Sequence, residues 1–186
     1  MTSEEPRLTL RLFQRHFFII LSFAVLGALW TYAEMGLAVV LQGTLLAFFL
    51  GGIVVFDIRY GLIFDRWLMG MCAAAVAFRV SDGFLTACIC GLAAGVLLLL
   101  LRYFSHGGMG GGDIKLAFVL GVWLSWPGIF IAIIASFWLG GAAAALMLAG
   151  KYKNLKSHIT FGPFLAFGAW IAYMYGERLW SLLQVI

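Results

Sequence analysis

Long apolar runs, separated by short polar breaks, make up nearly the whole of this chain. Hydrophobic residues are 64% of its 186 residues, charged residues are 11%, and the mean hydropathy is +1.05. Because an average soluble domain is about half apolar and a quarter charged, this composition excludes a soluble enzyme, a disordered protein and a basic domain that binds nucleic acid. At roughly 20 apolar residues per spanning helix, the chain has room for six or seven spans in a lipid bilayer.

The polar breaks predict where the spans begin and end. Pro127 ends the fifth span, because proline interrupts a helix. The third and fifth spans are short, and the count falls to six if either is re-entrant. We therefore predict an all-α polytopic membrane protein, a single integral domain over 1–186, with a short cytoplasmic segment at 1–15. The predicted spans are 17–33, 37–56, 67–80, 84–101, 114–126, 129–148 and 160–175.

The basic residues predict the orientation of these spans. With a cytoplasmic N-terminus, seven spans leave segments 1–15, 57–66, 102–115 and 151–158 on the inner side. Only Arg79 and Arg178 then fall on the outer side, as the positive-inside rule requires. The other ten of the twelve basic residues are Arg7, Arg11, Arg15, Arg59, Arg66, Arg102, Lys115, Lys151, Lys153 and Lys156.

Apart from Glu4 and Glu5 in the terminal segment, three acidic residues fall on the inner side: Asp57, Asp65 and Asp113. Asp57 directly follows the apolar run GGIVVF, and Asp113 directly precedes IKLAFVLGVW. Ionisable groups at membrane depth are candidates for function, and two carboxylates in one low-dielectric site share a proton and act as general base and general acid. The alternative is that each is a helix-end charge, paired with Arg59 or Lys115.

A glycine-rich loop precedes Asp113 in the segment GGMGGGD, residues 107–113. Its glycines give the backbone access to unusual conformations and to close contact with a ligand, so a peptide substrate has room to lie along it. A phosphate-binding loop would need Gly-Lys-Ser/Thr after the glycines, and the sequence here continues Asp113-Ile114. A flexible linker is the remaining alternative. The later run GGAAAA, residues 140–145, is typical of small-residue helix packing.

Three segments, in order, resemble the type IV prepilin leader peptidases, a family of GxGD-type intramembrane aspartic proteases. GGGDIKLAFVLGVW resembles the second aspartate motif, FDIRYGLIFDRW the first, and TFGPFLAFGAW a proline-containing C-terminal segment. Together they cover most of residues 50–170. The resemblance implies that Asp57 and Asp113 are the catalytic pair. The residues it implies as support for the loop or the substrate are Gly110, Gly111, Gly112, Lys115 and Asp65.

The chain departs from the family pattern at two points. Phe64 stands where the family usually has Pro, so the family pattern does not predict the backbone conformation after Asp57. The zinc domain with paired Cys-x-x-Cys motifs that many members carry, and that is linked to N-methylation, has no counterpart among Cys72, Cys88 and Cys90. The chain therefore resembles the short forms that only cleave, and methyltransferase activity is not expected.

The sequence thus predicts an aspartic endopeptidase of the bacterial inner membrane, without metal or cofactor. The resemblance implies that it cleaves the short basic leader of prepilins or pseudopilins at the cytoplasmic face. No nucleic-acid partner is expected, and the sequence leaves the oligomeric state open. Two alternatives remain: a catalytically silent member retained as an assembly or scaffold component, and a small transporter using the two aspartates as proton or cation sites.

Overall fold

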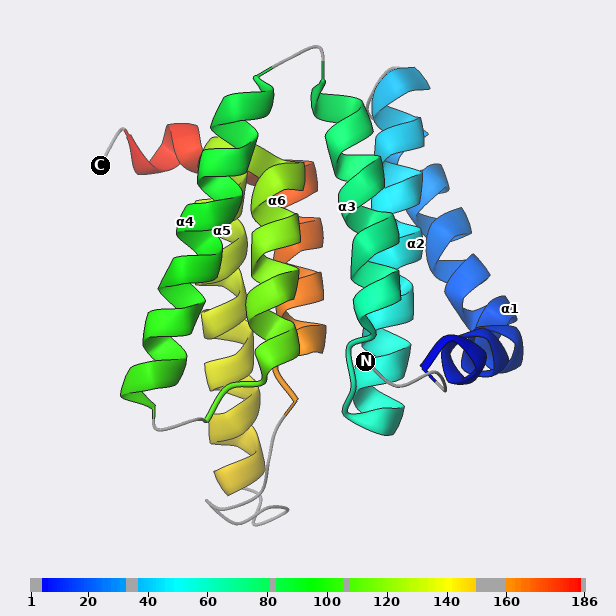
Figure 1. The fold of residues 1–186 in the computed structure, drawn as a ribbon. Coiled ribbons are helices and arrows are strands. Elements are labelled where there is room, and N and C mark those ends of the chain that lie inside the picture. The colour runs from blue at the N-terminus through cyan, green and yellow to red at the C-terminus, as the bar shows by residue number, and fades with distance from the viewer. Residues whose placement is uncertain (1–4, 33–36, 81–82, 106–107, 150–159, 185–186) are drawn as a thin grey trace.

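The computed structural model describes residues 5–32, 37–80, 83–105, 108–149 and 160–184, and within these ranges it contains helices and no strand. Six helical elements follow one another along the chain (Figure 1). Their bounds are α1 Glu5–Tyr32, α2 Leu37–Tyr60, α3 Asp65–Arg79, α4 Phe84–Phe104, α5 Gly111–Ala149 and α6 Gly162–Leu183.

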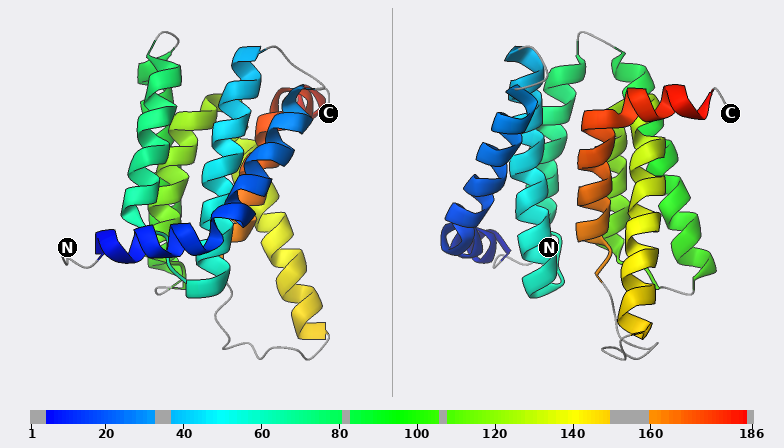
Figure 2. Two further views of the ribbon diagram at one scale, coloured as in Figure 1. Left: turned by 90° about the vertical axis from the view of Figure 1, so that its right-hand side faces the viewer. Right: turned by 180° about the vertical axis from the view of Figure 1, so that it is seen from behind.

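Helices α1 to α3 lie on one side of the bundle, and α4 to α6 lie on the other (Figure 1). The two sides meet where α2 contacts α6 and where α3 contacts α5. Figure 2 shows that the first turns of α1 lie across one end of the bundle, while the rest of that helix runs beside α2. Each side is therefore built from helices that are neighbours in sequence. Two pairs of helices distant in sequence, α2 with α6 and α3 with α5, join the two sides.

Helix α5 consists of two helical halves that meet at a break. Ser125 has φ 54° and Trp126 has φ −84° and ψ 140°, and Pro127 follows them. The chain reverses direction there, because Asp113 at the beginning of α5 and Ala144 near its end line the same cavity. The break predicted at Pro127 is confirmed, and it separates the fifth predicted span from the sixth.

Several other bounds differ from the sequence prediction. α1 begins at Glu5, so helix extends into the segment that was expected to be a short polar tail. α6 continues to Leu183, beyond the predicted end of the last span at residue 175. Among the described residues, three helices are long and apolar enough to cross a membrane: Val39–Tyr60, Phe84–Phe104 and Gly111–Met147. The all-α polytopic class is confirmed, and the side of the membrane that the N-terminus faces stays a prediction.

Small residues let the helices approach closely. A Cβ added at Gly91 of α4 would lie 2.7 Å from the Phe118 carbonyl oxygen of α5, and one added at Gly121 would lie 2.5 Å from the Gly91 Cα. Such close backbone contact is typical of membrane helices, which associate through packing rather than through exclusion of water. These two glycines fix α4 against the first half of α5, and so fix the helix that carries Asp113.

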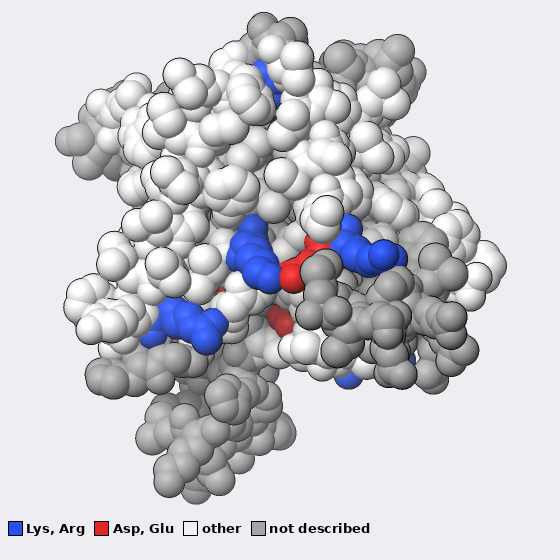
Figure 3. Space-filling model, viewed as in Figure 1, with Lys and Arg blue, Asp and Glu red and all other residues white. Residues whose placement is uncertain are grey.

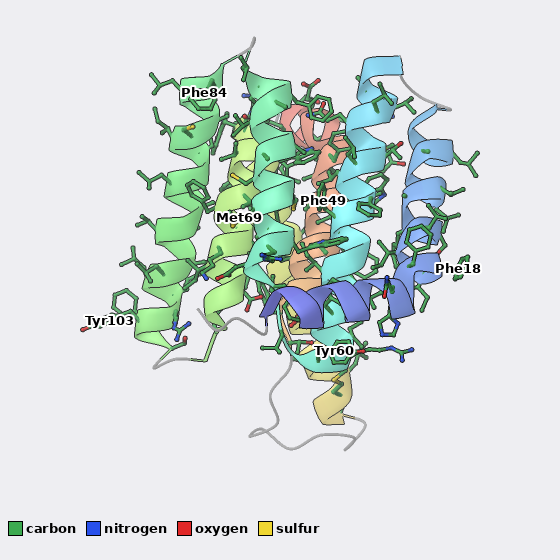
Figure 4. All side chains as sticks on the ribbon, turned by 45° about the vertical axis from the view of Figure 1, so that its right-hand side comes forward. Phe18, Phe49, Tyr60, Met69, Phe84 and Tyr103 are labelled. Atoms are coloured by element: carbon green, nitrogen blue, oxygen red, sulfur yellow. The ribbon has the colours of Figure 1, made fainter. Side chains whose placement is uncertain are left out.

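The outer surface of the bundle is apolar. Phe18, Phe84 and Tyr103 point away from it, and Phe49 lies between helices (Figure 4). On the face shown in Figure 3, charged side chains form a band across the middle of the molecule, and the described surface above this band is white apart from a small blue patch near the top. An uncharged, aromatic-rich surface of this kind suits contact with lipid chains.

Candidate active site

Asp57 lies at the start of the last turn of α2, and it is buried, with 6% of its surface exposed. The helix ends just after it because Gly61 adopts φ 63°, a left-handed conformation that stops helices, and the Gly61 N–H donates to the Asp57 carbonyl oxygen at 2.9 Å. The Asp57 Oδ2 atom is buried and has no hydrogen-bond partner among the described residues. An unpaired carboxylate oxygen of this kind is costly in a structural site and frequent in a functional one.

Asp113 lies in the first turn of α5, and it too is buried, with 6% of its surface exposed. The backbone N–H of Gly110 donates to its Oδ2 atom at 3.2 Å. The glycine loop therefore folds back on the aspartate that follows it, and the beginning of a helix is where a negative charge is best tolerated. A Cβ at Gly110 would lie 3.0 Å from the same oxygen, which leaves little room for a side chain there.

The two aspartates line one cavity of about 530 Å³. Asp57 comes from α2 and Asp113 from α5, 56 positions later in the chain, so the fold brings together the two residues that the sequence singles out. Much of the remaining lining is glycine or aromatic. The complete remaining lining is Gly61, Gly108, Met109, Gly110, Phe137, Gly140, Gly141, Ala144, Thr160, Phe161 and Phe164.

The beginning of α6 forms a wall of the site that sequence reasoning did not assign. Gly162 lies so close to Asp57 that an added Cβ would be 2.5 Å from its Oδ2 atom. Pro163 follows at the start of the helix, where proline is tolerated. The motif TFGPFLAFGAW was the available signal, but the sequence analysis interpreted it only as a proline-containing segment that resembles the family.

Gly140 and Gly141 also belong to the cavity, although the sequence was interpreted there as helix packing. A Cβ at Gly140 would lie 3.5 Å from the Phe161 ring, and one at Gly141 would have no atom within 4 Å. The absence of side chains at these two positions therefore widens the cavity on the second half of α5.

Of the residues expected to support the loop or the substrate, Gly110 lines the cavity, whereas Gly111, Gly112, Lys115 and Asp65 do not. The Lys115 Nζ donates to both carboxylate oxygens of Asp65, at 2.7 and 2.8 Å, and the two side chains are 57% and 39% exposed. Gly112 lies against Ile63 of the α2–α3 connection, where an added Cβ would be 2.9 Å from the Ile63 Cβ. Gly111 lies near the Arg102 guanidinium. These contacts hold the beginning of α3 beside the beginning of α5.

Phe64 has a backbone that proline would also adopt. Its φ is −75° and its ψ is 128°, close to the φ of about −65° that a proline ring imposes. The side chain is buried and packs edge-on against Phe56, with ring centroids 5.3 Å apart. The departure at this position therefore leaves the path of the chain after Asp57 compatible with the proline pattern, and aromatic packing holds the connection.

Two buried carboxylates beside a glycine-lined cavity define a class of protein: a helical membrane protein whose candidate chemistry is proton transfer between acidic groups. The model of the type IV leader peptidase family matches residues 44–145, more than half of the chain. The chain belongs to this family.

Known relatives support the same assignment. The chain is 28% identical over 147 residues to the prepilin leader peptidase/N-methyltransferase of Aeromonas hydrophila, covering 75% of this chain and 51% of the relative. It is 35% identical over 137 residues to the protein of that name from Bacillus subtilis, covering 69% and 53%. The chain thus spans about half the length of these relatives. No solved structure matches it.

Proposed function

We propose that this chain is an aspartic endopeptidase that cleaves the leader of type IV prepilins or pseudopilins at the cytoplasmic face of the bacterial inner membrane. The proposal rests on one observation above all: Asp57 and Asp113, two buried carboxylates from distant helices, line the same cavity. The names of the relatives supply the substrate class, and Asp57 and Asp113 are the proposed catalytic pair.

The lining of the cavity suits an extended peptide. Gly108, Gly110 and Gly141 present backbone without side chains, so a substrate backbone has room to lie close to the carboxylates. The acidic centre also suits a basic leader. Arg59 and Lys115 lie near the same end of the bundle as the aspartates, which supports a cytoplasmic position under the positive-inside rule.

The chemistry needs one ionised and one protonated carboxyl group. The ionised member takes a proton from a water molecule, whose oxygen attacks the carbonyl carbon of the scissile peptide bond. The protonated member donates its proton to the carbonyl oxygen, which gives a neutral tetrahedral intermediate. As the C–N bond breaks, the carboxyl group that gained the water proton passes it to the departing nitrogen, and the other regains its proton from the collapsing diol. The pair then returns to its initial state.

The experiment is cleavage of a purified precursor by the full chain in detergent or liposomes. The precursor carries a short basic leader that ends in glycine, followed by an apolar helix. Asp57→Asn and Asp113→Asn each keep the size of the side chain and remove its acid–base function, so cleavage should fall by about a thousandfold or more. Asp82→Asn, the same change in the segment between α3 and α4, is the matched control. Wild-type cleavage in either active-site variant would overturn the mechanism.

The same assay separates the remaining alternatives. A catalytically silent member would leave the precursor intact in the wild-type chain as well. A proton or cation transporter would instead give flux across proteoliposomes that Asp113→Asn abolishes, with no cleavage of the precursor.

A further inference from the structure

A second polar cavity, of about 440 Å³, lies at the other end of the bundle. The first half of α5 joins the two: Asp113 at its beginning lines the first cavity, and Trp123 near its end lines the second. At a rise of 1.5 Å per residue these positions are roughly 15 Å apart along the axis. The polar lining of the second cavity includes Gln42, Arg79, Trp123, Ser125, Glu177 and Arg178.

Arg79 brings a cation to this cavity from the last turn of α3. Its Nη2 donates to the Trp123 carbonyl oxygen at 2.9 Å, and its Nε is buried without a hydrogen-bond partner. Within the described ranges, no carboxylate lies at ion-pair distance from it. A half-buried guanidinium that lacks a counter-charge is costly, because desolvation is not offset by an opposite charge.

Trp123 adds a second unpaired donor on the same wall. Its side chain is 1% exposed, and the indole Nε1 is buried with no partner in the part of the chain that the structure describes. Both the guanidinium and the indole only donate hydrogen bonds. A group that completes this site must therefore accept them, and the cation requires that it carry negative charge.

The remaining charges leave the cavity net basic. Glu177 and Arg178 both lie on α6 and are exposed, so the two oppose each other at the mouth while Arg79 lies deeper. The second half of α5 begins at the same place, after Pro127, and its first turn adds the positive end of a helix. The ends of membrane helices lie at the depth of lipid headgroups.

We propose that this cavity binds one anionic phosphate group, with Arg79 and Trp123 as its donors. The Arg79 Nε and the Trp123 Nε1 are covered in the free chain. Binding therefore requires both side chains to shift until a phosphate oxygen accepts from the two N–H groups, and the charge then neutralises the guanidinium. The same chemistry is offered by the headgroup of an anionic phospholipid and by free phosphate. This site is separate from the aspartate cavity, and it does not depend on the proposed peptidase activity.

The test is the thermal stability of the full chain in an uncharged detergent, titrated with three probes. Dioctanoyl phosphatidylglycerol presents an anionic phosphate on lipid chains, dioctanoylglycerol presents the same chains without phosphate, and inorganic phosphate presents the anion alone. Because a ligand that binds the folded state raises the unfolding temperature, we expect phosphatidylglycerol to raise it and dioctanoylglycerol not to. A rise with inorganic phosphate as well assigns the site to free phosphate, and a rise with the lipid only assigns it to a headgroup.

Variants locate the binding. Arg79→Gln should weaken the affinity for the active probe by about tenfold or more, since it removes a charged donor. Trp123→Phe, which keeps the ring and removes only the N–H, should weaken it less and guards against misfolding of the first variant. Arg66→Gln, an exposed cation at the other end of α3, is the control and should bind as wild type. Wild-type affinity in both Arg79→Gln and Trp123→Phe overturns the proposal, as does an equal response to dioctanoylglycerol or no response to either phosphate probe.

Discussion

The two polar cavities of the bundle differ in the sign of the charge that they bury. Named after the predicted orientation of the spans, the inner cavity is the one that holds Asp57 and Asp113, and the outer cavity is the one that holds Arg79. Counting only partners in the described ranges, each cavity has buried polar atoms without a hydrogen bond: an acceptor at Asp57 in the first, and donors at Arg79 and Trp123 in the second. Burying an unpaired polar group in an apolar bundle costs free energy. Each end of the bundle therefore suits a ligand, and the ligand that suits one end differs in charge from the ligand that suits the other.

The largest expected effect tests whether the two ends act independently. Asp113→Asn should abolish precursor cleavage, by about a thousandfold or more, and leave the stabilisation by phosphatidylglycerol unchanged. Cleavage rates and unfolding temperatures measured on one preparation check this. Loss of the lipid response in Asp113→Asn would mean that the cavities are coupled or that the variant is misfolded, and circular dichroism separates these outcomes.

A smaller effect is expected from crowding the inner cavity without removing a carboxylate. Gly162→Ala places a methyl group against the Asp57 Oδ2 atom, so cleavage should fall by about ten- to a hundredfold as the pair is displaced. Gly95→Ala is the control, because its Cβ would meet Phe118 at an ordinary 3.4 Å. Equal activity in both variants would show that Gly162 does not set the position of Asp57.

The polar contacts between α3 and α5, one at each end of the bundle, should contribute differently to stability. Arg79 bonds a buried carbonyl oxygen, whereas the Lys115–Asp65 pair is largely exposed. Arg79→Met should destabilise the protein by about 2 kcal/mol, since charged hydrogen bonds contribute roughly 1.5–3 kcal/mol, and Lys115→Met by less than about 1 kcal/mol, as exposed pairs do. Unfolding in denaturant measures both losses of stability. A larger loss in Lys115→Met than in Arg79→Met would contradict the prediction that the Arg79 contact is the stronger one.

The smallest effect on cleavage is expected from Phe64→Pro. The backbone already has a proline-compatible φ, so activity should stay within about threefold of wild type. Stability should fall by about 3 kcal/mol or more, the usual cost of deleting a buried phenylalanine side chain. A loss of activity as large as that of Asp57→Asn would show that the connection needs the aromatic ring itself to position the aspartate.

Much of this arrangement follows from the sequence. Apolar runs predict the helices, Pro127 predicts the break in α5, and the scarcity of acidic residues singles out Asp57 and Asp113. The contact of Gly162 with Asp57 depends on how α6 packs against α2, which no local pattern specifies. The outer cavity was missed for the same reason, because Arg79 and Trp123 are 44 positions apart and meet only when α3 packs on α5. The basic segment 151–158, predicted to face the cytoplasm, lies outside the described residues.

The two aspartates come from opposite sides of the bundle, and this has a genetic consequence. Asp57 belongs to the side formed by α1 to α3, and Asp113 to the side formed by α4 to α6. A gene divided between these sides would encode two fragments, each with one aspartate of the pair, and neither would hold both. Complementation between co-expressed fragments would then report directly on the contacts of α2 with α6 and of α3 with α5, because cleavage would return only where the fragments associate in the membrane.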